Sequence, residues 1–157
     1  MKDLRFQCQT GCIRCCDQKG FVYLGATDIP RMAAYLGMTD AAFELRYVYR
    51  TKKWARLRTP PRKLQCHFLT AQGCSIHTVK PTQCRTFPFW PEIVESKSEW
   101  HRTASWCPGI GEGELIQIER IESAAQQMRA AYPHSYGSTI DPETMPADPE
   151  PLGPQRR

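Results

Sequence analysis

The sequence predicts a small, irregular α+β domain with short strands, an N-terminal helical pair and a C-terminal amphipathic helix. A length of 157 residues favours one domain. Leu, Ile, Val and Phe together number 28, about 18% of the chain and below the roughly 20% level at which disorder is expected. Eight cysteines accompany this small apolar content. The fold therefore needs stabilisation beyond its hydrophobic core.

The first half of the chain carries the helical pair. Gly20–Leu24 is a candidate short strand. A helix is predicted over residues 28–36, with Pro30 in its first turn and Gly37 at its end. A second helix is predicted over residues 40–50, with a partly apolar face. The two segments predict a small helical hairpin beside the region that holds the cysteines.

The second half contains one strongly periodic segment. Residues 54–68 are expected to form a loop with a short strand, and residues 92–106 a hairpin. Residues 112–132 are expected to form a helix, because apolar side chains recur there at steps of three and four. These are Leu115, Ile118, Ile121, Ala125, Met128 and Tyr132. Residues 138–157 alternate prolines with acidic residues and predict a flexible tail.

The cysteines form two groups along the chain. The first follows the pattern Cys-x3-Cys-x2-Cys-Cys and comprises Cys8, Cys12, Cys15 and Cys16. The second is more widely spaced and comprises Cys66, Cys74, Cys84 and Cys107. Residues 1–20 lack the apolar segment of a secretory signal, and no stretch has the ~18 apolar residues of a membrane span. We therefore expect a cytoplasmic protein without a membrane segment, whose thiols stay reduced.

Reduced thiols at this density predict metal ligation, and all eight cysteines are candidate ligands. Thiolates select soft ions such as zinc and also hold iron–sulfur clusters. Adjacent side chains diverge on a trans backbone, so Cys15 and Cys16 are expected to reach two metals or two corners of one cluster. Two zinc sites, one 4Fe–4S cluster with one zinc, and a polynuclear thiolate cluster all remain open. Because structural metal sites contribute folding energy, the metal-free form is expected to fold poorly.

The surroundings of the second cysteine group also fit a metal site. Gly73 permits a close backbone approach before Cys74, and Arg85 is expected to compensate thiolate charge beside Cys84. His67 and His77 are expected to be surface residues or hydrogen-bond partners of the ligands. Five aromatic residues are expected to shield the site from solvent: Phe87, Phe89, Trp90, Trp100 and Trp106.

The distribution of charged residues along the chain indicates which kinds of binding partner are expected. The formal net charge is +5, and no Asp or Glu occurs between Leu45 and Pro91, where ten Lys and Arg side chains lie. Such a run is typical of nucleic-acid contact or of compensation for anionic metal–thiolate centres. Because a charge run alone is weakly specific, we favour compensation. The partner is expected to be a protein or a small molecule.

Several motifs resemble one known family. Phe6-x-Cys8-x3-Cys12-x2-Cys15-Cys16 resembles the signature of the YkgJ-type CxxxCxxCC cysteine-cluster family, described as zinc- or iron-chelating domains. The segments Cys66–Leu69, Gly73–His77 and Lys80–Phe89 are similar to its second half, and Cys107-Pro108-Gly109 to its final element. The resemblance implies metal chelation and leaves the biochemical role open. Flagellin lysine N-methylases share a similar cysteine cluster.

These patterns together predict a cysteine-cluster metal-binding domain over residues 1–137. It is expected to hold an iron–sulfur cluster, zinc or both, and to act in redox chemistry, metal handling or partner modification. A methylase-like or oxidoreductase enzyme is the first alternative, although no glycine-rich nucleotide loop follows a strand. A zinc-stabilised nucleic-acid-binding module is the second. No catalytic residue stands out in the sequence.

Overall fold

The computed structural model describes residues 4–60 and 65–137. The chain divides into two compact units. The central unit is Ile13–Arg85, and the terminal unit combines Met1–Cys12 with Thr86–Arg157. The predicted tail over residues 138–157 lies outside the described residues. Short helices and short antiparallel strand pairs make up both units, so the predicted α+β class is confirmed.

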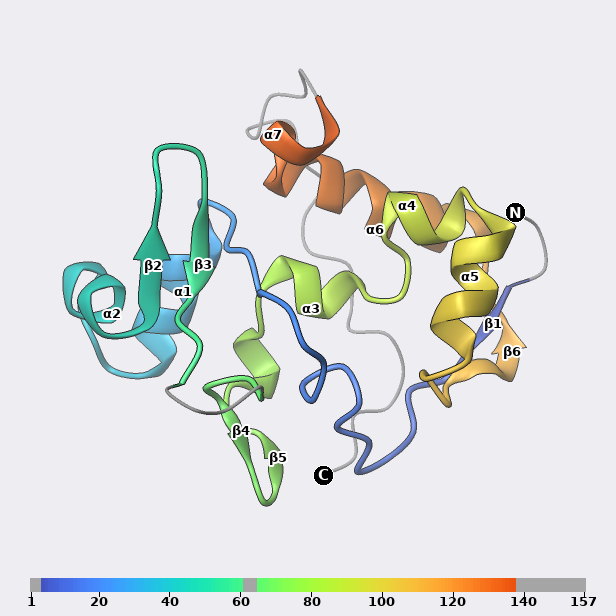
Figure 1. Cartoon of the computed structure of the whole chain (residues 1–157), viewed down its shortest axis with the longest axis horizontal. Helices are drawn as coiled ribbons and strands as arrows, with labels where there is room; N and C mark the ends of the chain where they lie inside the picture. The colour runs from blue at the N-terminus through green and yellow to red at the C-terminus, as the bar shows by residue number, and fades with distance from the viewer. Residues whose placement is uncertain (1–3, 61–64, 138–157) are drawn as a thin grey trace. The chain divides into compact units, whose positions relative to one another are not determined.

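The central unit consists of two helices followed by small hairpins and short helical turns (Figure 1). Its elements are α1 (Asp28–Tyr35), α2 (Asp40–Tyr47), β2 (Val48–Arg50), β3 (Ala55–Leu57), β4 (Leu69–Thr70), β5 (Gly73–Cys74), the 3-10 helix η1 (His77–Val79) and α3 (Thr82–Thr86). The pairs β2–β3 and β4–β5 are antiparallel.

The helical pair is confirmed, with a shorter second helix than predicted. Helix α1 ends before Gly37, whose φ of +65° lies in the left-handed region that glycine adopts readily. Thr39 caps α2 by accepting a hydrogen bond from the backbone N–H of Ala42 at 3.2 Å. The helix ends at Tyr47 rather than Arg50, because residues 48–50 are extended and pair with β3.

The core of the central unit lies between the helical pair and the hairpins. Phe43 and Met32 are fully buried, and the rings of Phe43 and Phe68 stack at a centroid distance of 6.5 Å. Cys66 and Cys74 pack against this core. Its buried members are Leu24, Ile29, Met32, Ala33, Phe43, Val48, Leu57, Phe68 and Ile76.

The terminal unit is built mainly from helices with one two-stranded ladder (Figure 1). Its elements are β1 (Arg5–Phe6), α4 (Pro91–Val94), α5 (Lys97–Ala104), β6 (Ile110–Leu115), α6 (Ile118–Ala131) and α7 (Pro133–Tyr136). Strand β1 pairs antiparallel with β6. No helix in the described parts of the chain is long and apolar enough to cross a membrane.

Two sequence predictions in this unit are wrong. Residues 92–106 are not a hairpin but carry α4 and α5, since the hydroxyl of Ser96 accepts a hydrogen bond from the Glu99 N–H and caps α5. The predicted helix over residues 112–132 begins only at Ile118, because residues 110–115 pair with β1. The amphipathic part is confirmed, with Ile121, Ala125 and Met128 buried.

Candidate metal centre

The eight predicted ligands are divided between the two units. All eight cysteines are free thiols. The central unit contains the five-thiol group: Cys15, Cys16, Cys66, Cys74 and Cys84. The terminal unit contains the three-thiol group: Cys8, Cys12 and Cys107. The N-terminal motif is thus split after Cys12, and its vicinal pair belongs with the later cysteines.

A backbone turn and one long-range hydrogen bond position the vicinal pair. The N–H of Cys16 donates to the carbonyl of Ile13 at 2.9 Å, which closes a tight turn. The carbonyl of Cys16 accepts a hydrogen bond from the N–H of Cys66 at 3.0 Å. This bond joins the N-terminal motif to the second cysteine group directly through the backbone.

The β4–β5 hairpin carries Cys66 just before it and Cys74 within it. The backbone N–H of Phe68 donates to the Cys66 sulfur, and the N–H of Ile76 donates to the Cys74 sulfur. Each donor lies two residues after its cysteine. Because a hydrogen bond to the charged form favours it, both donors help to form the thiolate, which is the metal-binding species.

Cys84 lies on α3, whose start is fixed by the buried carboxylate of Asp28. The Oδ1 of Asp28 accepts hydrogen bonds from the backbone N–H and the hydroxyl of Thr82, both at 3.0 Å. The Oδ2 atom accepts from the Gly25 N–H at 2.8 Å. Asp28 is fully buried and also pairs with Arg31 at 2.7 Å. The carboxylate therefore joins α1 to the helix that presents Cys84.

A second contact holds α3 to the segment after the vicinal pair. The Oε1 of Gln83 accepts a hydrogen bond from the Tyr23 N–H at 2.7 Å, and its Nε2 donates to the Phe21 carbonyl at 3.2 Å. The sequence did not indicate these roles of Asp28, Thr82 and Gln83. No local pattern could have revealed them, because each partner lies more than 50 residues away.

The five thiols interact electrostatically. A hydrogen bond with Cys16 lowers the pKa of Cys15 to about 6, and the same bond raises the pKa of Cys16. Burial raises the pKa of Cys66, Cys74 and Cys84, and neighbouring thiolates raise each of these values further. Mutual repulsion of this kind is relieved when a cation binds among the sulfurs.

Lys80 supplies the nearby positive charge. Its ammonium lowers the pKa of Cys15, Cys74 and Cys84. The sequence did not indicate this role of Lys80, and the expected compensation of thiolate charge by Arg85 stays a prediction. Lys80 Nζ also lies 3.4 Å from Nε2 of His77.

The two histidines near these cysteines are exposed side chains. The His67 ring packs against Tyr47 at a centroid distance of 5.0 Å and against Phe68 at 5.6 Å. His77 contacts Lys80. Both contacts fit the expected surface positions.

The three-thiol group lies where β1 runs beside the turn after α5. The N–H of Gln7 donates to the carbonyl of Gly109 at 2.9 Å, which brings the residue before Cys8 beside the turn that follows Cys107. Cys107 is buried, Cys12 is half-buried and Cys8 is exposed. A Cβ at Gly109 would lie 2.5 Å from the Gln7 carbonyl oxygen, so only glycine fits this close approach.

The predicted aromatic shell belongs to the terminal unit. Phe87 and Trp106 stack at 5.4 Å, and Phe89 lies edge-on to Phe6 at 5.6 Å. Phe89 belongs to the core of the unit that holds the three-thiol group, and Phe6 and Phe87 pack against that core. Within the central unit, the neighbours of Cys66 and Cys74 are the buried side chains of its own core.

The donor set fits a soft metal. Thiolate sulfur is the preferred ligand of zinc and of iron–sulfur clusters, and four suffice for either. The central unit holds five thiols with two N–H···S hydrogen bonds and one adjacent ammonium. Within residues 4–60 and 65–137, no three His, Cys, Asp or Glu side chains stand in an arrangement that could hold a metal ion as placed. The match between the site and a soft metal therefore depends on the chemistry of the thiol donors and on the electrostatic interactions among them.

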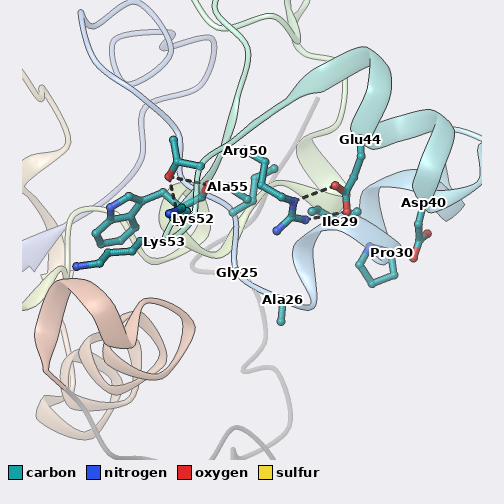
Figure 2. A pocket seen from close by; sticks show the side chains of 13 residues that line it. Gly25, Ala26, Ile29, Pro30, Asp40, Glu44, Arg50, Lys52, Lys53 and Ala55 are labelled. Atoms are coloured by element: carbon teal, nitrogen blue, oxygen red, sulfur yellow. Dashed lines mark hydrogen bonds and ion pairs between the residues drawn. The ribbon is translucent and has the colours of Figure 1, made fainter.

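An open cleft in the central unit lies apart from the thiols. It has a volume of about 460 Å³ and is lined by the start of α1, by α2 and by the β2–β3 hairpin. Figure 2 shows Arg50 directed toward Glu44 across this cleft; the two form an ion pair of 2.8 Å. No cysteine lines it.

A comparison with known protein families identifies the family of the chain. A family model described as "Putative zinc- or iron-chelating domain" (CxxCxxCC) matches residues 7–108. The chain belongs to this family. The matched span includes all eight cysteines, which confirms the resemblance that the sequence motifs indicated. The family name has two residues between its first two cysteines, whereas three separate Cys8 from Cys12 in this chain. No solved structure was found to match the chain.

Proposed function

We propose that this protein is a metal chelator whose principal centre is the five-thiol group of the central unit. The observation that carries the proposal is the electrostatic coupling of these thiols, drawn from three separate segments of the chain. Membership of a zinc- or iron-chelating family supports it. Eight free cysteines fit a reducing compartment such as the cytoplasm.

The residues of the central unit have distinct tasks in this proposal. Cys66, Cys74 and Cys84 supply buried ligands, and Lys80 offsets part of the negative charge that the thiolates bring. Cys15 is the thiol most readily ionised at neutral pH. Because adjacent side chains diverge, Cys16 would approach a metal from a different direction than Cys15. Bound zinc would supply structural stabilisation, and a bound iron–sulfur cluster would supply electron transfer.

The three-thiol group would hold a second centre. Three protein thiolates leave one position of a tetrahedral ion for water, a substrate or another donor. This arrangement supports a role in which the terminal unit presents a metal to a protein or small-molecule partner.

The test is metal analysis of protein purified without oxygen, together with its absorption spectrum. Several irons per chain with absorption near ~400 nm would identify an iron–sulfur cluster, and colourless protein with one or two zinc ions would identify zinc. Protein that binds neither metal after reconstitution would overturn the proposal.

Substitutions separate the two groups. Cys74→Ser should remove the metal of the central unit, and Cys107→Ser should remove only that of the terminal unit. Ser75→Ala is the control for the hairpin, because it changes the neighbouring residue without removing a thiol. Unchanged metal content in both Cys74→Ser and Cys84→Ser would exclude the five-thiol group as the principal centre.

A further inference from the structure

The β2–β3 hairpin is extended by a third segment into a small sheet. Leu24 N–H donates to the Ala55 carbonyl at 2.9 Å, and Leu57 N–H donates to the Val22 carbonyl at 2.8 Å. Arg56 is paired with Tyr23 on one side and with Tyr49 on the other. Residues 22–24 therefore lie antiparallel to β3 through one bridge, on the side of β3 opposite to β2.

The two faces of this sheet differ sharply. Side chains alternate along each strand, so directly paired residues share a face. Val48 and Leu57 are paired and buried in the central core, together with Leu24. The opposite face carries aromatic and basic side chains: Phe21, Tyr23, Tyr49 and Arg56.

The outer face is an exposed platform of stacked groups. Phe21 is 49% exposed and Tyr49 is 47% exposed. The guanidinium of Arg56 lies 3.8 Å from the centroid of the Phe21 ring and 4.6 Å from that of Tyr49. These contacts hold both rings in place while leaving half of each exposed. Ordered, exposed aromatic rings beside guanidinium groups are the elements on which unpaired bases stack.

Basic side chains adjoin the strands of the platform. The exposed Arg58 follows β3, with its N–H bonded to the Tyr47 carbonyl at 2.7 Å, and Lys52 and Lys53 lie in the turn between β2 and β3, where they also line the cleft. No acidic residue occurs between Leu45 and Pro91. The nearest carboxylate before this stretch, Glu44, is engaged by Arg50 at the cleft.

The side chains of Lys52, Lys53 and Arg58 are exposed, so they can reach an external partner. A partner that is anionic along its length and offers flat rings is complementary to this surface.

We propose that this sheet face binds single-stranded nucleic acid, with bases stacked on Phe21 and Tyr49 and phosphates held by Lys52, Lys53 and Arg58. This interaction is separate from metal chelation. A protein that only held metal would not need exposed rings fixed beside a guanidinium group.

The test uses full-length, metal-loaded protein and a fluorescein-labelled single-stranded RNA of about 12 nucleotides, followed by anisotropy at about 50 mM salt. The same sequence as single-stranded DNA and as duplex RNA provides the comparison. We expect binding to the single strands, weakened at least about fivefold by either Phe21→Ala or Tyr49→Ala, the lower end of what one stacked base contributes. Arg58→Gln should reduce the slope of log K against log salt by about 0.7.

Matched controls keep the result interpretable. Tyr35→Ala removes a ring that is 51% exposed and lies on α1 rather than on one of the three paired segments, and it should leave binding unchanged. Arg102→Gln removes an exposed guanidinium in the terminal unit and should do the same. Circular dichroism and metal content should match the unsubstituted protein for every variant.

Three outcomes would overturn the proposal. The first is no saturable binding of either single strand up to about 100 μM protein. The second is binding that depends on salt and is insensitive to both ring substitutions. The third is preference for duplex RNA, or occupation of the face by a protein ligand that the oligonucleotide does not displace. A higher affinity for RNA than for DNA would support recognition of the 2′-hydroxyl.

Discussion

The carboxylate of Asp28 and the first residue of α3, Thr82, are joined by two hydrogen bonds of 3.0 Å across 54 residues of sequence. Asp28 lies at the start of α1, and Cys84 lies two residues after Thr82. The carboxylate is fully buried, so these bonds are not in competition with water. Asp28 therefore positions a thiol of the proposed centre without touching it.

Replacing Asp28 should destabilise the central unit. Asp28→Ala removes the acceptor of Thr82 and Gly25 and the carboxylate partner of Arg31, which we expect to cost about 2–4 kcal/mol of unfolding free energy. Chemical denaturation of metal-loaded protein would measure the loss. Glu44→Gln is the control, because its ion pair with Arg50 is exposed and should contribute less than about 1 kcal/mol. Equal effects of the two substitutions would contradict a special role for Asp28.

Lys80 should tune the metal affinity of the five-thiol group. Its charge lowers the pKa of Cys15, Cys74 and Cys84, so Lys80→Gln should leave these thiols more often protonated. We expect apparent metal affinity to fall about tenfold, as measured by competition with a chelator at constant pH.

The control for this substitution is Lys53→Gln in the β2–β3 turn. It removes the same charge at a distance from the cysteines and should leave metal affinity unchanged. If both substitutions lowered the affinity equally, the effect would reflect net charge rather than the position of Lys80.

Metal binding should strengthen steeply with pH. Burial raises the pKa of Cys66, Cys74 and Cys84, so these thiols carry protons at neutral pH and a metal must displace them. Three displaced protons predict about a thousandfold gain in apparent affinity per pH unit below the ordinary thiol pKa, and Cys16, whose pKa is also raised, would add a further factor of about ten if it binds the same metal. Cys15 contributes little to this slope above pH 7, since its pKa is about 6.

Chelator competition at two pH values, about one unit apart, would measure this slope. In metal-free protein the same raised pKa values make folding stability decrease, rather than increase, as the pH rises. Their contribution to stability is present below the unfolded-state thiol pKa and is lost as the pH rises through the folded-state values. A metal affinity independent of pH would contradict the assignment of these three thiols as ligands.

Gly109 should be needed for the three-thiol group. A methyl group there would lie 2.5 Å from the Gln7 carbonyl oxygen, so Gly109→Ala should force β1 away from the turn after Cys107. We expect a loss of about 2 kcal/mol in unfolding free energy and a lower metal content in the terminal unit. Thermal unfolding and metal analysis would show both effects.

Gly111→Ala provides the comparison, because an added methyl at this position meets open space. Gly111→Ala should therefore cost only the strain of placing alanine at a φ of +92°, about 1 kcal/mol of unfolding free energy. Retention of full metal content by Gly109→Ala would show that the spacing of Cys8 and Cys107 is not critical.

Local signals predicted several elements well. The cap at Thr39 and the stop at Gly37 act within one helical turn, and the structure confirms both. The same local reasoning placed residues 112–115 in a helix, because Leu115 continues the apolar spacing of α6. Pairing with β1, more than 100 residues earlier, makes this segment a strand instead.

The amino-acid sequence by itself determined the α+β class, the family and the set of candidate thiols, because these depend on residue identity and short-range spacing. Only the tertiary structure assigned five cysteines to one compact unit and three to the other, with the boundary between Cys12 and the vicinal pair. It also showed Lys80 acting on the buried thiols and Asp28 hydrogen-bonded to the start of α3. The physical reason is that hydrogen bonds and charges act through space. The backbone N–H of Cys66 donates to the carbonyl of Cys16, and that of Thr82 donates to the carboxylate of Asp28. Each pair is about 50 residues apart in the sequence, so no local pattern predicts either hydrogen bond.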